Sequence, residues 1–305
     1  MCRVLGYGSR GHASVAELIG EPGLREFTAL STAHGDGWGM AASNGGQMQI
    51  AKAPRRASDD PAYERLAHSP IGDLGLVHLR WATPGLPVLD RNSHPFRYGD
   101  FAMAHNGAIH PQDRLPQMLP PQWEQRLSGS TDSERYFLHI MYRLEARGGD
   151  VVAAVADTVR HIRANYIPNS LNALLLAPGT LYAISWHDPE RIPYAAMRER
   201  GFCGSDADAS CYFDLDYQVR QDAVVVASTG WPQDGWNVLP NGSVLVIDQA
   251  TLATRVELLY SCPRGVTSCG GARSDPGTSV SSATPAGSAV GADAPGGPGG
   301  AAAAS

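Results

Sequence analysis

The sequence predicts an α+β protein whose strands and helices are stacked in layers. Three observations support this prediction. Short apolar runs typical of strands fill much of the first hundred residues, two helical patterns follow between residues 131 and 165, and strand patterns return after residue 170. Strands and helices therefore do not alternate regularly, as they would in a βαβ fold, and the sequence contains no internal repeat.

The first part of the chain is expected to form strands and short helices. The expected strands are residues 3–7, 38–42, 48–53, 74–79 and 101–105, and the expected helices are residues 14–19, 24–32 and 62–68. Asn44-Gly45-Gly46 predicts a hairpin turn between the second and third strands. Gly20, Pro22 and Gly23 separate the first two helices because they interrupt helical backbone.

The clearest helix begins at a capping box. Thr131 and Glu134 have the S/T-x-x-E spacing, and apolar residues follow on one face as far as Leu144. A second helix with a similar apolar stripe is expected over residues 151–165. The strands expected after it are residues 171–176, 181–186, 223–227, 243–247 and 254–258.

Composition divides the chain into one domain, residues 2–262, and a tail, residues 263–305. The tail holds ten Gly and five Pro and has no aromatic residue. Such a segment cannot bury enough apolar surface to offset its ordering entropy, so we expect it to be disordered.

The chain as a whole suggests a cytoplasmic protein that acts on a small molecule. A net charge of −6 without a basic run argues against nucleic acid or an anionic membrane as partner. We find no apolar window long enough to span a membrane and no secretory signal in the first 30 residues. Five cysteines without a CxxC motif indicate reduced thiols.

Two cofactor hypotheses are weak. Residues 6–11 form a literal GxGxxG, but no second strand ends in an acidic residue at the distance that a dinucleotide site requires. The histidines lack the HExxH and paired-cysteine spacings of metal sites, and Cys203 with Cys211 offers no further ligands. We therefore expect no nicotinamide, flavin or metal, and no other cofactor.

Cys2 is a candidate nucleophile. If Met1 is removed, Cys2 becomes the first residue and carries a thiol and a free α-amine together. Their reference pKa values are about 8.5 and 7.7–8.0, so the amine is partly neutral at physiological pH and can accept the thiol proton. A second-position cysteine also occurs by chance, so this hypothesis depends on other residues.

Several polar residues at predicted strand and helix ends complement Cys2. Arg80 and Thr83 suit capture of a carboxylate, although each could equally be structural. Asn106 and Gly107 could form an ordinary turn or an oxyanion hole. Asp132, at the start of the capped helix, could accept from a substrate ammonium group. Together with Cys2, they describe a site for an α-amino acid whose acyl group is transferred.

The same residues lie in motifs that resemble the class II glutamine amidotransferases of the N-terminal-nucleophile hydrolase superfamily. The motifs run in family order across most of residues 2–140: Met1-Cys2-Arg3-Val4-Leu5-Gly6-Tyr7, His34-Gly35-Asp36-Gly37-Trp38-Gly39, Arg80-Trp81-Ala82-Thr83, Asn92-Ser93-His94-Pro95-Phe96, His105-Asn106-Gly107 and Ser130-Thr131-Asp132-Ser133-Glu134.

This resemblance implies a four-layer αββα sandwich and a role for each site residue. Cys2 would be the nucleophile, and Asn106 and Gly107 the oxyanion hole. Arg80 and Thr83 would hold the carboxylate end of glutamine, and Asp132 its α-amine.

Two departures from the family pattern bear on the substrate. Synthase-linked members continue after Arg-Trp-Ala-Thr with His-Gly, where this chain has Pro84-Gly85, and they carry a synthase domain that this sequence lacks. The chain looks closer to the stand-alone branch that includes the ergothioneine-pathway hydrolase of γ-glutamyl-hercynylcysteine sulfoxide. We therefore expect an amidohydrolase acting on a γ-glutamyl amide. A glutaminase serving a separate synthase partner and a catalytically silent γ-glutamyl-binding relative remain alternatives.

Overall fold

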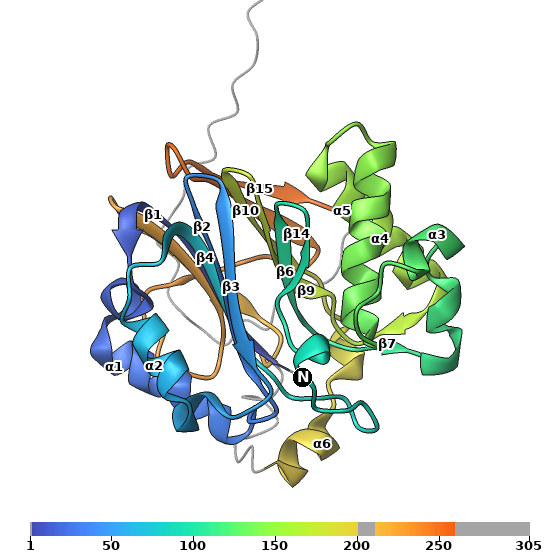
Figure 1. Ribbon diagram of the computed structural model, residues 1–305, viewed down its shortest axis with the longest axis horizontal. Coiled ribbons are helices and arrows are strands. Elements are labelled where there is room, and N and C mark those ends of the chain that lie inside the picture. The colour runs from blue at the N-terminus through green and yellow to red at the C-terminus, as the bar shows by residue number, and fades with distance from the viewer. Residues whose placement is uncertain (1, 201–210, 260–305) are drawn as a thin grey trace, which may run out of the picture. The chain divides into compact units, whose positions relative to one another are not determined.

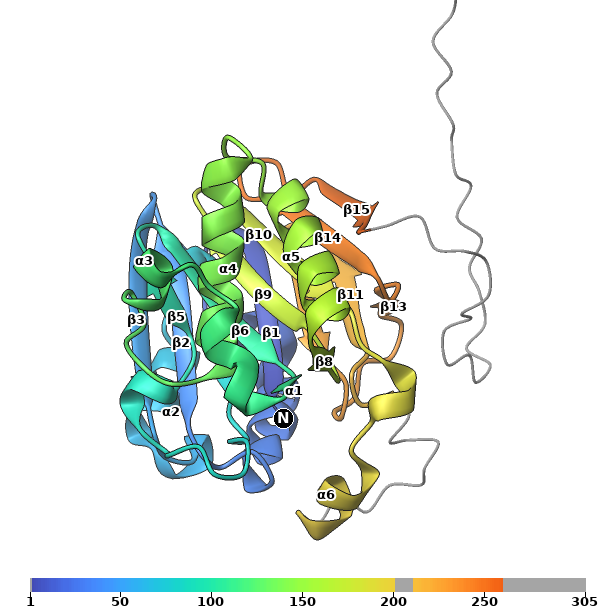
Figure 2. The same ribbon diagram turned by 90° about the vertical axis from the view of Figure 1, so that its right-hand side faces the viewer.

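Two antiparallel sheets lie face to face, and helices cover the outer face of each (Figures 1 and 2). The computed structural model describes residues 2–200 and 211–259. Within these residues the layers are α1 (Val15–Ala29) and α2 (Pro61–Ala67), the first sheet, the second sheet, and α4 (Asp132–Ala146) and α5 (Val151–Asn165). This confirms the four-layer αββα arrangement. The boundary at residue 262, the tail and Cys203 lie outside the described residues.

The first sheet has the strand order β13-β11-β12-β1-β4-β2-β3 in the described part of the chain. Its strands are β1 (Arg3–Ala13), β2 (Trp38–Asn44), β3 (Gln47–Ala53), β4 (Gly72–Leu79), β11 (Leu215–Val219), β12 (Ala223–Ser228) and β13 (Asn237–Val238). The β2–β3 hairpin is confirmed, and both Gly45 and Gly46 have the positive φ that its turn requires.

The second sheet has the order β15-β14-β10-β9-β6-β5 over the same residues. Its strands are β5 (Phe96–Tyr98), β6 (Phe101–Asn106), β9 (Asn172–Ala177), β10 (Thr180–Ser185), β14 (Ser243–Asp248) and β15 (Thr254–Leu258). A separate pair joins β7 (Ile109–His110) to β8 (Ile167–Pro168).

The central strands are apolar on both faces because each sheet is covered on both sides. In β9, Leu174 and Leu176 pack between the sheets, whereas Leu175 packs under the helices of the second sheet. This two-residue alternation explains why β9 is a continuous apolar run and not an alternating one.

β1 extends to Ala13, well beyond the predicted end at residue 7, because it pairs with both β12 and β4. Gly6 and Gly8 therefore lie inside a strand and not in a phosphate-binding turn. A Cβ atom at Gly6 would lie 3.0 Å from the side chains of Leu174 and Leu181 in the facing sheet. The glycine permits close packing of the sheets, which gives this part of the GxGxxG match a structural reason.

The helices largely follow the sequence prediction. They are α1 (Val15–Ala29), α2 (Pro61–Ala67), α3 (Pro121–Glu124), α4 (Asp132–Ala146), α5 (Val151–Asn165) and α6 (Tyr194–Glu199). The two helices expected before residue 33 form one kinked helix, α1, in which Gly20 has a φ of +73°. None of the helices in the described ranges is both long and apolar enough to cross a membrane.

The capping box of α4 forms only in part. Thr131 Oγ1 accepts a hydrogen bond from the Glu134 amide at 3.1 Å, as predicted. The Glu134 carboxylate instead accepts from the amides of Ser128 and Gly129, both at 2.8 Å. It therefore anchors the loop before α4 and not the capping residue itself, so that part of the prediction is wrong.

Candidate active site

Cys2 and Asn106 meet where the two sheets face each other. Cys2 precedes β1 in the first sheet, and Asn106 ends β6 in the second. The Cys2 backbone nitrogen donates a 2.7 Å hydrogen bond to Asn106 Oδ1, and the two residues are 4% and 0% exposed. Asn106 Nδ2 is buried without a hydrogen-bond partner among the described residues. An unused amide donor therefore lies beside the cysteine.

The end of β4 brings a third segment to Cys2. Arg3 and Leu79 are paired in neighbouring strands, so the residues after Leu79 lie next to the start of β1. The backbone nitrogen and oxygen of Trp81 lie 3.5 and 3.7 Å from Cys2 Sγ. The thiol is therefore held against the loop that carries Arg80 and Thr83.

Gly107 occupies a place where no side chain fits. A Cβ atom there would lie 2.0 Å from the Ser170 carbonyl oxygen and 2.7 Å from His105 Nε2. The close approach of the 169–170 backbone thus requires glycine directly after Asn106.

Arg80 is a buried cation beside the thiol. It is 2% exposed, its Nη2 donates to the Pro87 carbonyl oxygen at 3.4 Å, and its Nη1 has no partner among the described residues. Burial lowers the pKa of Arg80, while Cys2, Asp36 and Asp132 act in the opposite direction. The guanidinium therefore keeps donor capacity for an anionic ligand.

Asp132 lies in the first turn of α4 and is 2% exposed. Its Oδ2 accepts from the Ile109 amide at 2.8 Å. The neighbouring Ser133 Oγ lies 2.9 Å from His105 Nδ1, which links α4 to β6. Burial lowers the pKa of His105, and the Asp132 carboxylate opposes this shift. Asp132 Oδ1 lies 3.5 Å from Ser133 Oγ. A fixed carboxylate, whose oxygens can each accept more than one hydrogen bond, suits an ammonium ligand.

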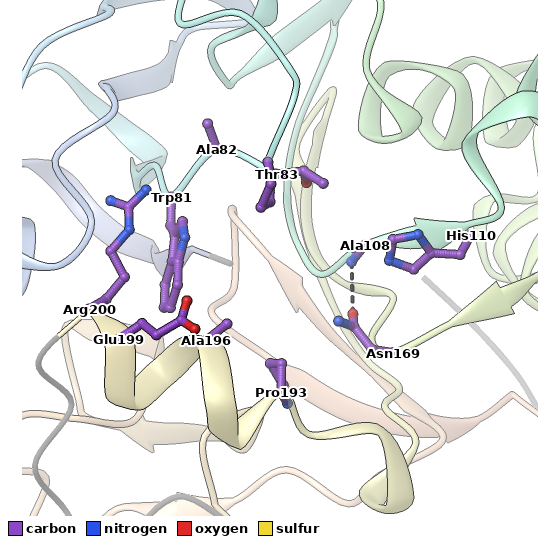
Figure 3. A pocket seen from close by; sticks show the side chains of 11 residues that line it. Trp81, Ala82, Thr83, Ala108, His110, Asn169, Pro193, Ala196, Glu199 and Arg200 are labelled. Carbon is purple, nitrogen blue, oxygen red and sulfur yellow. Dashed lines mark hydrogen bonds between the residues drawn. The ribbon is translucent and has the colours of Figure 1, made fainter.

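Thr83 lines a pocket of about 390 Å³ beside these buried residues (Figure 3). The pocket is lined by Trp81, Ala82, Thr83, Pro84, Ala108, His110, Asn169, Pro193, Ala196, Glu199 and Arg200. Cys2, Arg80 and Asp132 are not among its lining residues. The predicted site residues thus divide into a buried group around Cys2 and the half-buried Thr83, which borders the pocket.

Sequence reasoning missed two residues that hold the site together. Asp36 donates its amide to the Arg80 carbonyl at 3.0 Å, and its Oδ2 accepts from the Ala82 amide at 2.9 Å. Asn169 Oδ1 accepts from the Ala108 amide at 2.8 Å, a contact drawn in Figure 3. The position of Asp36 within the glycine-rich motif of residues 34–39 was the available signal, because short polar residues in such loops commonly bind backbone.

The described residues contain no group of three or more His, Cys, Asp and Glu side chains that could hold a metal ion. Cys211 is half-buried, whereas Cys203, its possible partner, lies outside the described ranges.

Two stacked antiparallel sheets, each covered by helices on its outer face, are the fold of the N-terminal-nucleophile hydrolases. The particular family follows from the sequence. A family model described as "Glutamine amidotransferases class-II" matches residues 1–261. The chain therefore belongs to the class II glutamine amidotransferase family.

Curated relatives with this domain are much longer than the match. Glutamine–fructose-6-phosphate aminotransferase from Mycobacterium bovis is 29% identical over 239 residues, which are 76% of this chain and 36% of that protein. The enzyme of the same name from Brucella suis is 32% identical over 217 residues, 70% of this chain and 32% of that protein. The chain thus spans about one third of the length of these relatives.

Two solved structures share the fold. A glutamine aminotransferase class-II domain protein from Silicibacter pomeroyi has a TM-score of 0.58 at 19% identity, over 85% of this chain and all of that one. Glutamine phosphoribosylpyrophosphate amidotransferase from B. subtilis has a TM-score of 0.55 at 20% identity, over 85% of this chain and 49% of that one.

Proposed function

We propose that this protein is an amidohydrolase that uses Cys2 to cleave a γ-glutamyl amide and release glutamate. The observation that carries the proposal is the buried contact between Cys2 and Asn106. It sets a thiol beside an amide nitrogen that has no partner among the described residues. A nucleophile next to an unused hydrogen-bond donor is the minimum arrangement for acyl transfer.

The proposed reaction begins with removal of Met1, which frees the α-amine of Cys2. This amine takes the thiol proton, and the thiolate attacks the γ-carbonyl carbon. Asn106 Nδ2 and the Gly107 amide donate to the oxyanion. The C–N bond then breaks, the protonated α-amine returns a proton to the leaving nitrogen, and a γ-glutamyl thioester remains. Water hydrolyses the thioester to glutamate and regenerates the thiol, so no metal or organic cofactor takes part.

The glutamate end of the substrate would bind to the charged groups around the thiol. Arg80, supported by Thr83, would hold the α-carboxylate, and Asp132 would accept from the α-ammonium group. The free Nη1 donor of Arg80 and the buried carboxylate of Asp132 support this orientation, because a zwitterionic end needs one fixed charge of each sign.

The leaving amine distinguishes two forms of this function. We favour a stand-alone hydrolase of γ-glutamyl-capped small molecules, for which γ-glutamyl-hercynylcysteine sulfoxide is one candidate substrate. The alternative is a glutaminase that delivers ammonia to a synthase partner. The curated relatives, named as aminotransferases that use glutamine, favour this alternative.

The test is glutamate release by the Met1-processed protein from glutamine and from larger γ-glutamyl amides. We expect Cys2→Ala to lower kcat/KM by more than about a thousandfold, because no other group supplies the nucleophile. Cys211→Ala is the matched control and should retain wild-type rates, since Cys211 lies outside the site. Normal turnover by Cys2→Ala would exclude the mechanism. An N-terminus that retains Met1, detected by mass spectrometry, would favour a silent γ-glutamyl-binding protein.

A further inference from the structure

The pocket beside Cys2 has more room than the release of ammonia requires. Ammonia is close in size to water, which occupies about 30 Å³ per molecule in the liquid. A pocket of about 390 Å³ is more than ten times larger, and of the residues assigned above to the glutamate end only Thr83 borders it. Trp81, whose backbone contacts the thiol, and Ala108, one residue after Gly107, both line it. The pocket is therefore bordered by residues that lie next to the thiol and to Gly107.

Apolar and charged side chains lie side by side in the lining of the pocket (Figure 3). Trp81, Pro193 and Ala196 present ring and methyl surface. Glu199 and Arg200, at the end of α6, supply the charged groups of the lining.

The two charged residues differ in their partners. Arg200 Nη2 lies 3.2 Å from Asp36 Oδ2, and its guanidinium lies 5.2 Å from the centre of the Trp81 ring. Its positive charge is therefore already paired. Glu199 makes no hydrogen bond or ion pair with any described residue, and in Figure 3 its carboxylate points toward the Trp81 ring. The pocket thus holds one uncompensated negative charge.

We propose that this pocket binds the amine part of a γ-glutamyl amide, and that this amine carries a second, cationic group that faces Glu199. The proposal rests on the proposed function, because the amide bond must lie at Cys2 for its amine part to enter the pocket. Trp81, Pro193 and Ala196 contact the carbon chain of the amine, and Glu199 selects its charged end. An anionic amine is disfavoured by the same carboxylate.

The experiment compares three γ-glutamyl amides of similar length, with 4-aminobutyl, n-pentyl and 4-carboxybutyl groups on nitrogen, and glutamine as reference. We expect kcat/KM for the aminobutyl amide to exceed that for the pentyl amide about two- to fivefold, the size of an exposed ion pair. The carboxybutyl amide should be the slowest of the three. The aminobutyl amide should also exceed glutamine.

Two variants and a control locate the effect. Glu199→Gln should bring the ratio of kcat/KM for the aminobutyl amide to kcat/KM for the pentyl amide to about one. Glu190→Gln, an exposed glutamate outside the pocket lining, should keep the wild-type ratio. Ala196→Phe should lower kcat/KM of the aminobutyl and pentyl amides relative to glutamine, because the larger ring occupies their space. A wild-type ratio at or below one, or a ratio unchanged by Glu199→Gln, overturns the proposal.

Failure of the proposal and failure of the proposed function can be told apart. Cys2-dependent release from glutamine, with little from any larger amide, overturns the pocket assignment and leaves the glutaminase function standing. If no substrate releases glutamate, calorimetry on Cys2→Ala decides the pocket assignment alone. The pocket assignment is supported if Cys2→Ala binds the aminobutyl amide more tightly than the pentyl amide and if this difference is lost in Cys2→Ala/Glu199→Gln. Equal binding of the two amides to Cys2→Ala overturns the assignment.

Discussion

The two sides of the proposed scissile bond are built in different ways. On the acyl side, Cys2, Arg80, Asn106 and Asp132 are each at most 4% exposed and lie at the ends of strands or the start of a helix. On the amine side, α6 and its neighbouring loops present exposed residues such as Glu199. The position of the reacting groups is thus determined by the packed sheets, whereas the selectivity proposed here depends on surface segments that can change without disturbing the core.

The contacts on the acyl side and on the amine side differ in strength because they differ in burial. The Cys2–Asn106 hydrogen bond is fully buried, and leaving either group unpaired would cost about 1–3 kcal/mol. The Arg200–Asp36 ion pair that fastens the end of α6 is 40% and 22% exposed, and such pairs contribute about 0–1 kcal/mol. Substitutions on the acyl side should therefore have much larger effects than substitutions on the amine side.

After Cys2→Ala, the largest effect is expected for Asn106→Ala. Loss of an oxyanion-hole donor lowers kcat by about 10²- to 10³-fold, and KM should change far less because Asn106 does not hold the charged end of the substrate. Steady-state kinetics with glutamine measures this split, with circular dichroism to confirm that the variant is folded. Asn165→Ala, at the exposed end of α5, is the control. A kcat within tenfold of wild type would remove Asn106 from the proposed mechanism.

A decrease in pH should have an intermediate effect, and it should act on the free energy of unfolding. His94 is buried with its ring centre 4.1 Å from that of His78, and neither nitrogen of His94 has a hydrogen-bond partner among the described residues. Burial lowers the pKa of His94 well below its ordinary value, and His78, His105 and Arg80 lower it further. The folded protein therefore keeps His94 neutral, whereas the unfolded chain protonates it below about pH 6.5.

Acid therefore lowers the stability of the folded protein. The unfolded state binds more protons, so stability is fully present above about pH 6.5 and falls as the pH decreases. Each such histidine contributes about 1.4 kcal/mol per pH unit. Urea unfolding measured between pH 8 and 5 should show this dependence of the free energy of unfolding on pH. His94→Gln should reduce the slope by about 1.4 kcal/mol per pH unit, the contribution of one histidine. An unchanged slope in the variant would mean that His94 is already protonated in the folded state.

The difference in burial between the acyl side and the amine side also explains which parts of the molecule could be predicted from the sequence. The central strands and the α4–α5 pair were predictable because apolar periodicity reflects burial directly. The site residues lie at the ends of those elements, and their motifs carried the family resemblance that implied a common site for Cys2 and Asn106. The motif at Asp36 was visible, but its partner Arg200 lies 164 residues away and no local pattern connects them.

The short elements escaped prediction for another physical reason. The helix α6 has six residues, too few for a full apolar stripe, and β11 has only five and carries polar residues. Tertiary contacts, and not local propensity, determine such segments. Most of the amine side consists of such segments, so the pocket could be found only in the structure.

The smallest effect is expected for Arg200→Gln, and it tests whether the two sides are independent. Removal of this positive charge from the pocket lining should raise the preference for the cationic aminobutyl amide over glutamine about two- to fivefold and change stability by less than about 0.5 kcal/mol. Arg191→Gln, which breaks an exposed ion pair with Asp188 outside the pocket, should leave the preference unchanged. Asp36→Asn, in contrast, should also slow glutamine hydrolysis, because Asp36 accepts from the Ala82 amide in the loop that carries Arg80. Equal loss on glutamine and on the amide in Arg200→Gln would show that α6 supports the reacting groups themselves, and the division into two sides would then be wrong.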